Sequence, residues 1–439
     1  MPPDTIPTNG WRQPVKGSCN QPANAGRSSG GWIRTAVLVW SLIVAVVCVR
    51  AAVQPYKRTL FTTWEQAGAD WEQGHDLYRR SWSPDQDQFR YSPLTAMLLV
   101  PFHHLPIRLG GVVWRLLNAA VLLGGFALWL RAAPLPRTPR QQAVLFLLLA
   151  PLSLSSLNNG QPNPLVIGLL LAALAAVDKE RWSLAAGLVA LATAVKVYPL
   201  ALGLLLAAVY PRRFTLRLLL ALALAATLPF AFQHRDYVYS QYIQWLHRLG
   251  KDNRWDWPLH MAYRDLWLLI RLFHVPLTPR GYLGVQLASA AGCAALCLAA
   301  RLRGWPRRDV LAVILVLGTC WMTLCGPATE SSTYILLAPA LAWTVQRAES
   351  ERWPWLLGLM TRMALVLFLF CVVRGLWPGV NRIHALGLQP QAALLLCLAY
   401  VMVLVRELRM AKLQTVSRDS KGSASGLPFE SRLTNAAGW

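Results

Sequence analysis

Long apolar stretches alternate with short polar segments along most of the chain. A helix needs about 20 apolar residues to cross a bilayer. The apolar stretches predict about twelve spans, at approximately 35–53, 109–130, 141–157, 163–178, 183–196, 197–210, 214–232, 283–300, 309–325, 331–346, 355–375 and 387–405. We therefore predict an all-α polytopic membrane protein.

Two stretches depart from a simple crossing. Residues 183–196 and 197–210 are both short, and Pro199 lies near their junction, so they are also compatible with a broken or re-entrant pair. Residues 92–105 are apolar but contain Pro93 and Pro101. For this stretch we predict a re-entrant or interfacial helix rather than a crossing.

Basic residues indicate the orientation of the bundle. Arg and Lys cluster in alternate short loops, and the positive-inside rule places these loops and both termini in the cytoplasm. The outer face then receives 54–91, 158–162, the surroundings of Lys196, 233–282, 326–330 and 376–386. We predict disordered cytoplasmic tails at 1–31 and 411–439, flanking an integral membrane domain at 32–410.

Composition supports this class. Hydrophobic residues make up 55% of the chain and charged residues 14%, whereas soluble domains carry about 25% charged residues. The net charge of +23 comes largely from the loops between spans, so it does not indicate nucleic-acid binding. The eight cysteines show no disulfide framework or metal-ligand spacing, and no nucleotide-binding fingerprint is present. We expect neither a metal nor a cofactor.

The first outer loop combines carboxylates with aromatic rings. Glu65 and Asp70 are interleaved with Trp64, Trp71 and Tyr78. One carboxylate could act as a general base beside a sugar-binding or lipid-binding aromatic platform. The alternative is an ordinary solvated interfacial helix. Glu330, at the tip 326–330, is a further candidate, and the alternative for it is a solvated tip.

Two cations and an amide-rich tip complete the candidate chemistry. Arg90 precedes the short helix and suits a phosphate, although an interfacial Arg that snorkels is an alternative. Lys196 is predicted at the membrane rim, where a buried charge usually faces a cavity or partner. Asn159, Gln161 and Asn163 offer donors and acceptors suited to sugar hydroxyls, or form a tight polar turn.

These motifs, in this order, resemble glycosyltransferase family 87, which contains polyprenol-phosphate-mannose-dependent mannosyltransferases. The resemblance covers roughly residues 60–200 and rests on Ala67-Gly68 through Gly74 to Leu77-Tyr78, Phe89-Arg90-Tyr91-Ser92-Pro93-Leu94, Pro101, Leu105-Pro106, Trp114-Arg115-Leu116-Leu117-Asn118, Asn159-Gly160-Gln161-Pro162-Asn163 and Lys196-Val197-Tyr198-Pro199. It implies a GT-C fold with an active site on the outer face and a lipid-phosphate sugar as donor.

The family pattern has an Asp where this chain has Leu60. Three alternatives follow: a nearby acid replaces it, the carboxylate comes from elsewhere, or activity is lost. We place Glu65 or Asp70 first as the base and Glu330 second. The resemblance implies that Arg90 and Lys196 bind the donor phosphate. Substrate binding is assigned to Tyr91, Asn159, Gln161, Asn163 and Tyr198.

The expected activity is an inverting hexosyltransferase of the plasma membrane. It would transfer a mannose-like sugar from a polyprenyl phosphate to a lipid or glycan acceptor on the extracytoplasmic face. Membrane lipids would be further partners. The alternatives are a multi-span transporter or lipid flippase, and a catalytically inactive relative of the same fold.

Overall fold

The computed structural model describes residues 25–79, 88–135, 138–251, 254–374 and 386–424. Within these ranges the chain forms helices and no strand. The α-helices are α1 (Ala25–Val53), α2 (Phe61–Glu72), α3 (Pro93–His103), α4 (Ile107–Ala132), α5 (Pro139–Asn158), α6 (Asn163–Asp178), α7 (Trp182–Val195), α8 (Leu200–Val209), α9 (Leu216–Thr227), α10 (Arg235–Lys251), α11 (Leu266–Leu272), α12 (Pro279–Leu302), α13 (Arg307–Leu324), α14 (Ala338–Ser350), α15 (Trp355–Arg374) and α16 (Leu388–Ala424). Three short helical segments are η1 (Pro211–Thr215), η2 (Leu228–Ala231) and η3 (Ser331–Leu336).

Seven helical segments of the described chain are long and apolar enough to cross a membrane. They are Gly30–Val53, Ile107–Ala132, Pro139–Asn158, Pro211–Ala231, Pro279–Leu302, Trp355–Val372 and Leu388–Met410. The protein is therefore a multi-pass membrane protein. The other five predicted spans fall on α6, α7, α8, α13 and the η3–α14 segment. These helices are shorter or carry charges at one end, so twelve crossings stays a prediction.

The helix α6 lies at the centre of the bundle and packs against α4 and α7. Glycines permit its close contact with α4. A Cβ atom on Gly125 would lie 2.1 Å from the carbonyl oxygen of Gly168, and one on Gly168 would lie 2.3 Å from that of Val121. The two backbones touch because neither glycine has a side chain.

The junction of α7 and α8 is broken, which fits the alternative of a broken pair that Pro199 suggests. The helix α7 ends at Val195, Lys196 adopts an extended conformation, and α8 begins at Leu200 after Pro199. Proline lacks a backbone N–H and disfavours helical backbone in the preceding residue, so the chain leaves the helix here. The break exposes Lys196 to the site described below.

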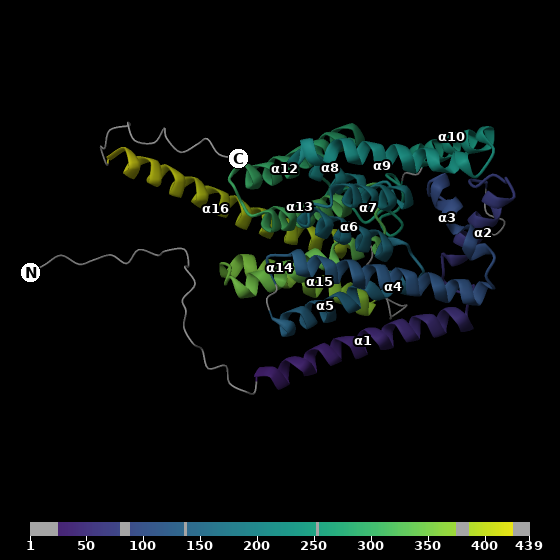
Figure 1. Ribbon diagram of the computed structural model, residues 1–439, viewed down its shortest axis with the longest axis horizontal. Coiled ribbons are helices and arrows are strands. Elements are labelled where there is room, and N and C mark those ends of the chain that lie inside the picture. The colour runs from purple at the N-terminus through teal and green to yellow at the C-terminus, as the bar shows by residue number, and fades with distance from the viewer. Residues whose placement is uncertain (1–24, 80–87, 136–137, 252–253, 375–385, 425–439) are drawn as a thin grey trace, which may run out of the picture.

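A hydrophobic cluster separate from the main core lies at one end of the bundle. It joins α2, α3, the first turns of α4, and α10 through the side chains of Phe61, Trp64, Trp71, Leu77, Phe89, Leu99, Trp114 and Val238. Figure 1 shows α2, α3 and α10 together at the right, opposite the start of α1 and the end of α16. The predicted helix at 92–105 is α3, which packs against α2. Its re-entrant or interfacial nature stays a prediction.

The basic loops that the charge pattern assigns to the cytoplasm meet at the end of the bundle opposite α2, α3 and α10. Arg308 pairs with Asp178 at 3.2 Å, and Arg213 with Glu180 at 3.6 Å. Arg307 also donates to Glu180. The loops after α6, α8 and α12 therefore share one end of the bundle, as the alternation of basic loops requires.

The tails differ in part from the prediction. Residues 1–24 and 425–439 lie outside the described residues, but α1 already begins at Ala25 and α16 continues to Ala424. The start of the predicted C-terminal tail is therefore helical. Residues 406–414, which lead into this tail, are all Arg, Glu, Leu, Met, Ala, Lys or Gln, which are strong helix formers and extend the preceding span.

Candidate active site

The amide-rich tip between α5 and α6 is held by hydrogen bonds to its backbone carbonyls. The Asn159 carbonyl accepts from the Leu60 N–H at 2.9 Å. The Gly160 carbonyl accepts from the indoles of Trp64 (3.1 Å) and Trp114 (2.8 Å). Gly160 has φ of +65°, a conformation that glycine adopts without a steric penalty. The tip is therefore fixed against α2 and α4.

Arg115 of α4 stabilises the same tip through hydrogen bonds. Its side chain is buried, and the guanidinium donates to the Gly111 carbonyl (3.0 Å), the Thr59 hydroxyl (3.0 Å) and the Asn158 carbonyl (2.9 Å). These contacts link the end of α5 to the segment that precedes α2. Arg115 thus holds the site together rather than snorkelling to the membrane surface.

The start of α3 is tied to the end of α7. The hydroxyls of Ser92 and Thr95 both donate to the Ala194 carbonyl, at 2.6 and 2.9 Å. This places Tyr91 beside Lys196, whose Nζ lies 5.9 Å from the centroid of the Tyr91 ring and 5.5 Å from that of Tyr198. Both distances are within the range of a cation–π contact.

These segments enclose a cavity of about 130 Å³, which we call the cation cavity. Six of the ten predicted site residues line it, and they come from four separate parts of the sequence. They are Arg90, Tyr91, Gln161, Lys196, Tyr198 and Glu330. The remaining wall is formed by Leu60, Thr63, Trp64, Gln88, Val195, Val197, Trp245, Leu249, Pro327 and Ala328.

The charges of the cation cavity influence one another. Loss of water around Lys196, together with the nearby Arg90 cation, lowers the pKa of the Lys196 ammonium to about 8, and Glu330 acts in the opposite direction. The Glu330 carboxylate lies 3.4 Å from Arg254 and its side chain is 42% exposed. One cavity therefore combines two cations with a carboxylate open to solvent.

Two further predicted residues lie next to the cavity without lining it. Asn163 is fully buried; its amide accepts from the Tyr198 hydroxyl at 2.9 Å and donates to the Ser332 carbonyl at 3.0 Å. The Asn159 amide oxygen accepts from the Asn158 side chain at 3.5 Å. In this structure both asparagines support the wall.

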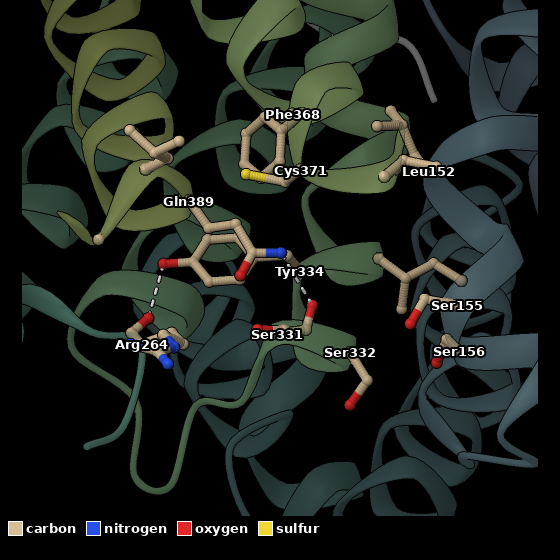
Figure 2. Close-up of a pocket in the computed structure, with 14 residues that line it drawn as sticks. Leu152, Ser155, Ser156, Arg264, Ser331, Ser332, Tyr334, Phe368, Cys371 and Gln389 are labelled. Carbon is tan, nitrogen blue, oxygen red and sulfur yellow. Dashed lines mark hydrogen bonds between the residues drawn. The ribbon is translucent and has the colours of Figure 1, made fainter. Parts of the chain in front are cut away.

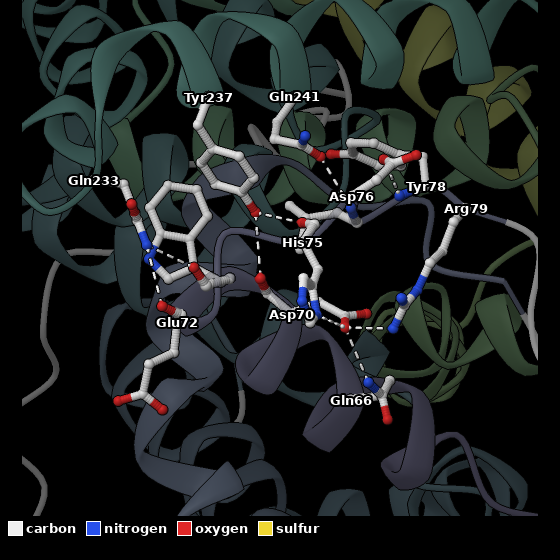
Figure 3. Close-up of polar contacts among 12 residues, drawn as sticks. Gln66, Asp70, Glu72, His75, Asp76, Tyr78, Arg79, Gln233, Tyr237 and Gln241 are labelled. Carbon is white, nitrogen blue, oxygen red and sulfur yellow. Dashed lines mark hydrogen bonds and ion pairs between the residues drawn. The ribbon is translucent and has the colours of Figure 1, made fainter.

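The two carboxylates favoured by the sequence lie elsewhere. Glu65 of α2 contacts His103 of α3 at 3.2 Å, and neither residue lines the cation cavity. Asp70 is buried, and Figure 3 shows it between Gln66, Arg79 and His75, at the base of a network that reaches α10. Of the three candidate bases, Glu330 alone lines the cation cavity. The amphipathic pattern of α2 could not distinguish these positions.

Sequence reasoning did not single out two residues of the site. Arg254 contacts Glu330, and its guanidinium lies 4.6 Å from the centroid of the Tyr263 ring. Trp245 lines the cavity and donates to the Arg90 carbonyl at 3.2 Å. The abundance of Trp, Tyr, His and Arg in 233–282 was the available signal, but it identified no single residue.

Comparison with known sequences identifies the family. Residues 89–327, more than half of the chain, match glycosyltransferase family 87. The chain belongs to glycosyltransferase family 87. The resemblance inferred from the motifs is thereby confirmed, and the matched region contains Arg90, Gln161 and Lys196. Glu330 lies just beyond it.

One curated relative of this family 87 chain is named a polyprenol-phosphate-mannose-dependent alpha-(1-2)-phosphatidylinositol pentamannoside mannosyltransferase, from Mycobacterium tuberculosis (strain CDC 1551 / Oshkosh). It is 27% identical over 285 residues, and the match spans 61% of this chain and 62% of the relative. Among solved structures, ArnT from Cupriavidus metallidurans bound to undecaprenyl phosphate is 15% identical with a TM-score of 0.42, covering 91% of this chain and 81% of that one.

Proposed function

We propose that this family 87 protein is a membrane glycosyltransferase that transfers a mannose-like hexose from a polyprenyl phosphate to a lipid or glycan acceptor. One observation carries the proposal: Arg90, Lys196 and Glu330, far apart in sequence, line a single cavity. The name of the curated relative supports a polyprenyl-phosphate donor.

Arg90 and Lys196 bind the donor phosphate in this proposal. The phosphate becomes more negative as the bond to the sugar breaks, so fixed cations stabilise the transition state more than the ground state. Burial and the nearby Arg90 cation lower the pKa of the Lys196 ammonium to about 8, and a phosphate between the two cations would oppose both effects.

The sugar lies between the aromatic rings and the amide of the cavity. Tyr91 and Tyr198 offer flat apolar surfaces, and Gln161 offers one donor group and one acceptor. Sugar rings present apolar C–H faces and polar edges, so this combination of side chains suits them.

Glu330 is the base in this mechanism. A hydroxyl oxygen of the acceptor forms a bond to the anomeric carbon while the bond from that carbon to the phosphate oxygen breaks. The hydroxyl proton passes to Glu330, and the bonding electrons leave with the polyprenyl phosphate. A single displacement of this kind inverts the anomeric configuration. Arg254, 3.4 Å from the carboxylate, orients it.

The site belongs to the extracytoplasmic face in this proposal. The elements around the cation cavity lie at the end of the bundle that carries α2, α3 and α10, while the paired basic loops lie at the other end. The positive-inside rule then assigns the basic end to the cytoplasm.

The test is transfer by the purified protein in lipid nanodiscs. Polyprenyl-phosphate mannose labelled in the sugar is the donor, and octyl α-mannoside is the acceptor probe. We expect a labelled disaccharide product and free polyprenyl phosphate. The variant K196M should lose most of this activity. No release of labelled sugar with either a mannose or a glucose donor would refute the proposal.

Leu60 supports a second candidate function, that of an inactive relative which binds the lipid phosphate without transferring the sugar. Leu60 lines the cation cavity at the position where the family resemblance has an Asp. The variant L60D distinguishes an active transferase from an inactive relative. If the wild-type chain transfers no sugar and L60D does, the wild-type protein is an inactive relative. Activity in the wild-type chain that E330Q removes indicates an enzyme with a relocated base.

A further inference from the structure

A second cavity of about 270 Å³ lies between α5, η3, the last turns of α15 and the start of α16. We call it the serine cavity. Figure 2 shows its two sides: Phe368, Cys371 and Leu152 lie on one, and serines from α5 and η3 lie on the other. Its polar members are Ser155, Ser156, Arg264, Ser331, Ser332, Tyr334 and Gln389. The cavity is thus amphipathic, and its described lining residues include no carboxylate.

Two serines of α5 line the serine cavity, one exposed and one buried without a hydrogen-bond partner. Ser156 is 1% exposed, and its hydroxyl has no hydrogen-bond partner although it lines the cavity. A buried hydroxyl without a partner is unfavourable by the cost of its lost hydration. Ser155, one residue earlier, is exposed and lines the same cavity. By contrast, the hydroxyl of Ser153 donates to the Leu149 carbonyl at 2.8 Å.

The serine cavity and the cation cavity share one wall. Glu330 lines the cation cavity, and the next two residues, Ser331 and Ser332, line the serine cavity. The buried amide of Asn163 bridges the two, since it accepts from the Tyr198 hydroxyl and donates to the Ser332 carbonyl. A ligand in the serine cavity would therefore lie beside the proposed base.

We infer that the serine cavity binds the acceptor, a neutral polyhydroxylated glycoside with an apolar tail. This inference rests on the proposed function. In a single displacement the acceptor must approach the anomeric carbon from the side opposite the leaving phosphate. Arg90 and Lys196 line only the cation cavity, whereas Ser331 and Ser332 follow Glu330 directly, so an acceptor in the serine cavity would approach from the Glu330 side.

The chemistry of the lining specifies a neutral headgroup. Hydroxyls and the Gln389 amide pair with sugar hydroxyls as donors and acceptors. Among the described lining residues the cation is Arg264, which donates to the carbonyls of Leu259 (3.1 Å) and His260 (2.8 Å), so it supports the wall. Phe368 and Leu152 form an apolar surface suited to an alkyl tail.

The experiment separates acceptor binding from donor cleavage. In nanodiscs, binding of octyl α-mannoside below its micelle concentration is measured by calorimetry without donor, and the KM values for acceptor and polyprenyl-phosphate mannose are measured separately. S155F fills the cavity from an exposed position, and S156A removes the unpartnered hydroxyl. S153A, on the same helix outside the cavity, is the matched control.

We expect S155F to weaken octyl mannoside binding at least tenfold and to leave the donor KM unchanged. S156A should weaken it about fivefold, the effect of one neutral hydrogen bond, and S153A should leave it unchanged. Unaltered binding in S155F, or a rise in donor KM instead, overturns the inference. Because calorimetry needs no turnover, binding that S155F abolishes supports the acceptor site even in a chain that transfers no sugar.

Discussion

Two isosteric substitutions, Glu330→Gln and Asp70→Asn, distinguish a catalytic carboxylate from a structural one. Each removes a single negative charge. Asp70 is 6% exposed at its side chain and accepts from Arg79 at 2.7 Å and Gln66 at 3.0 Å. Glu330 is 42% exposed, with Arg254 at 3.4 Å. The structure therefore predicts opposite effects on stability and on turnover.

The stability effect follows from burial. Removing one partner of a fully buried ion pair costs about 3–5 kcal/mol. Arg79 is 31% exposed, and the asparagine oxygen can still accept one hydrogen bond, so we expect a loss of about 1–3 kcal/mol in D70N. The pair at Glu330 is open to solvent, and E330Q should cost about 1 kcal/mol or less.

The kinetic effect runs the other way. A general base contributes about 10²–10⁴-fold to the rate, so E330Q should lose kcat by that factor while retaining the affinity for polyprenyl-phosphate mannose. D70N, assayed below its lowered unfolding temperature, should retain kcat within a few-fold. The backbone carbonyl of Asp70 accepts a hydrogen bond from the Tyr237 hydroxyl of α10 at 3.5 Å (Figure 3). Asp70 therefore links α2 to α10 and takes no part in proton transfer.

Unfolding temperature and single-turnover rate are measured on the same nanodisc samples. The reasoning is refuted by a D70N variant that unfolds like the wild type yet loses kcat a hundredfold. An E330Q variant with wild-type kcat would equally remove Glu330 from the mechanism. E65Q serves as a control, because Glu65 pairs with His103 outside the cavity.

Three further predictions follow. Because the pKa of Lys196 is about 8, the ammonium is lost above that pH, and kcat/KM for the donor should fall there. In K196R the same kcat/KM should not change over this pH range. A wild-type kcat/KM that is independent of pH contradicts the assignment of Lys196 to the donor phosphate. G160A forces alanine to a φ of +65° and should destabilise the protein by about 1 kcal/mol or more in thermal unfolding. G125A places a Cβ 2.1 Å from a carbonyl oxygen and should cost about 1–3 kcal/mol or more, whereas G124A, with open space around it, should be neutral.

The helical architecture was largely readable from the sequence. Apolar length located the long spans, and alternating basic loops predicted which loops meet at one end, where Arg308 and Asp178 now pair. Short helices were harder to assign. Helices such as α6 and α13 are buried by neighbouring protein rather than by lipid, and hydropathy responds to both environments in the same way.

The candidate site was predictable in its cations and less so in its carboxylate. Arg90 and Lys196 stood out because charges near apolar spans usually have a functional partner. Glu65 and Asp70 stood out only through their place in the first outer loop. Which acid faces the cations depends on how α2 rotates against α3 and α4, and on where the loop before η3 folds back.

By itself the sequence determined that the chain is a helical membrane protein of family 87, because span length, loop charge and short motifs are local properties. Only the tertiary structure decided that Glu330 rather than Asp70 shares a cavity with Lys196, and that serines of α5 face η3 across a second cavity. The physical reason is that these groups lie on separate helices. Their proximity is set by side-chain packing and buried hydrogen bonds between distant segments.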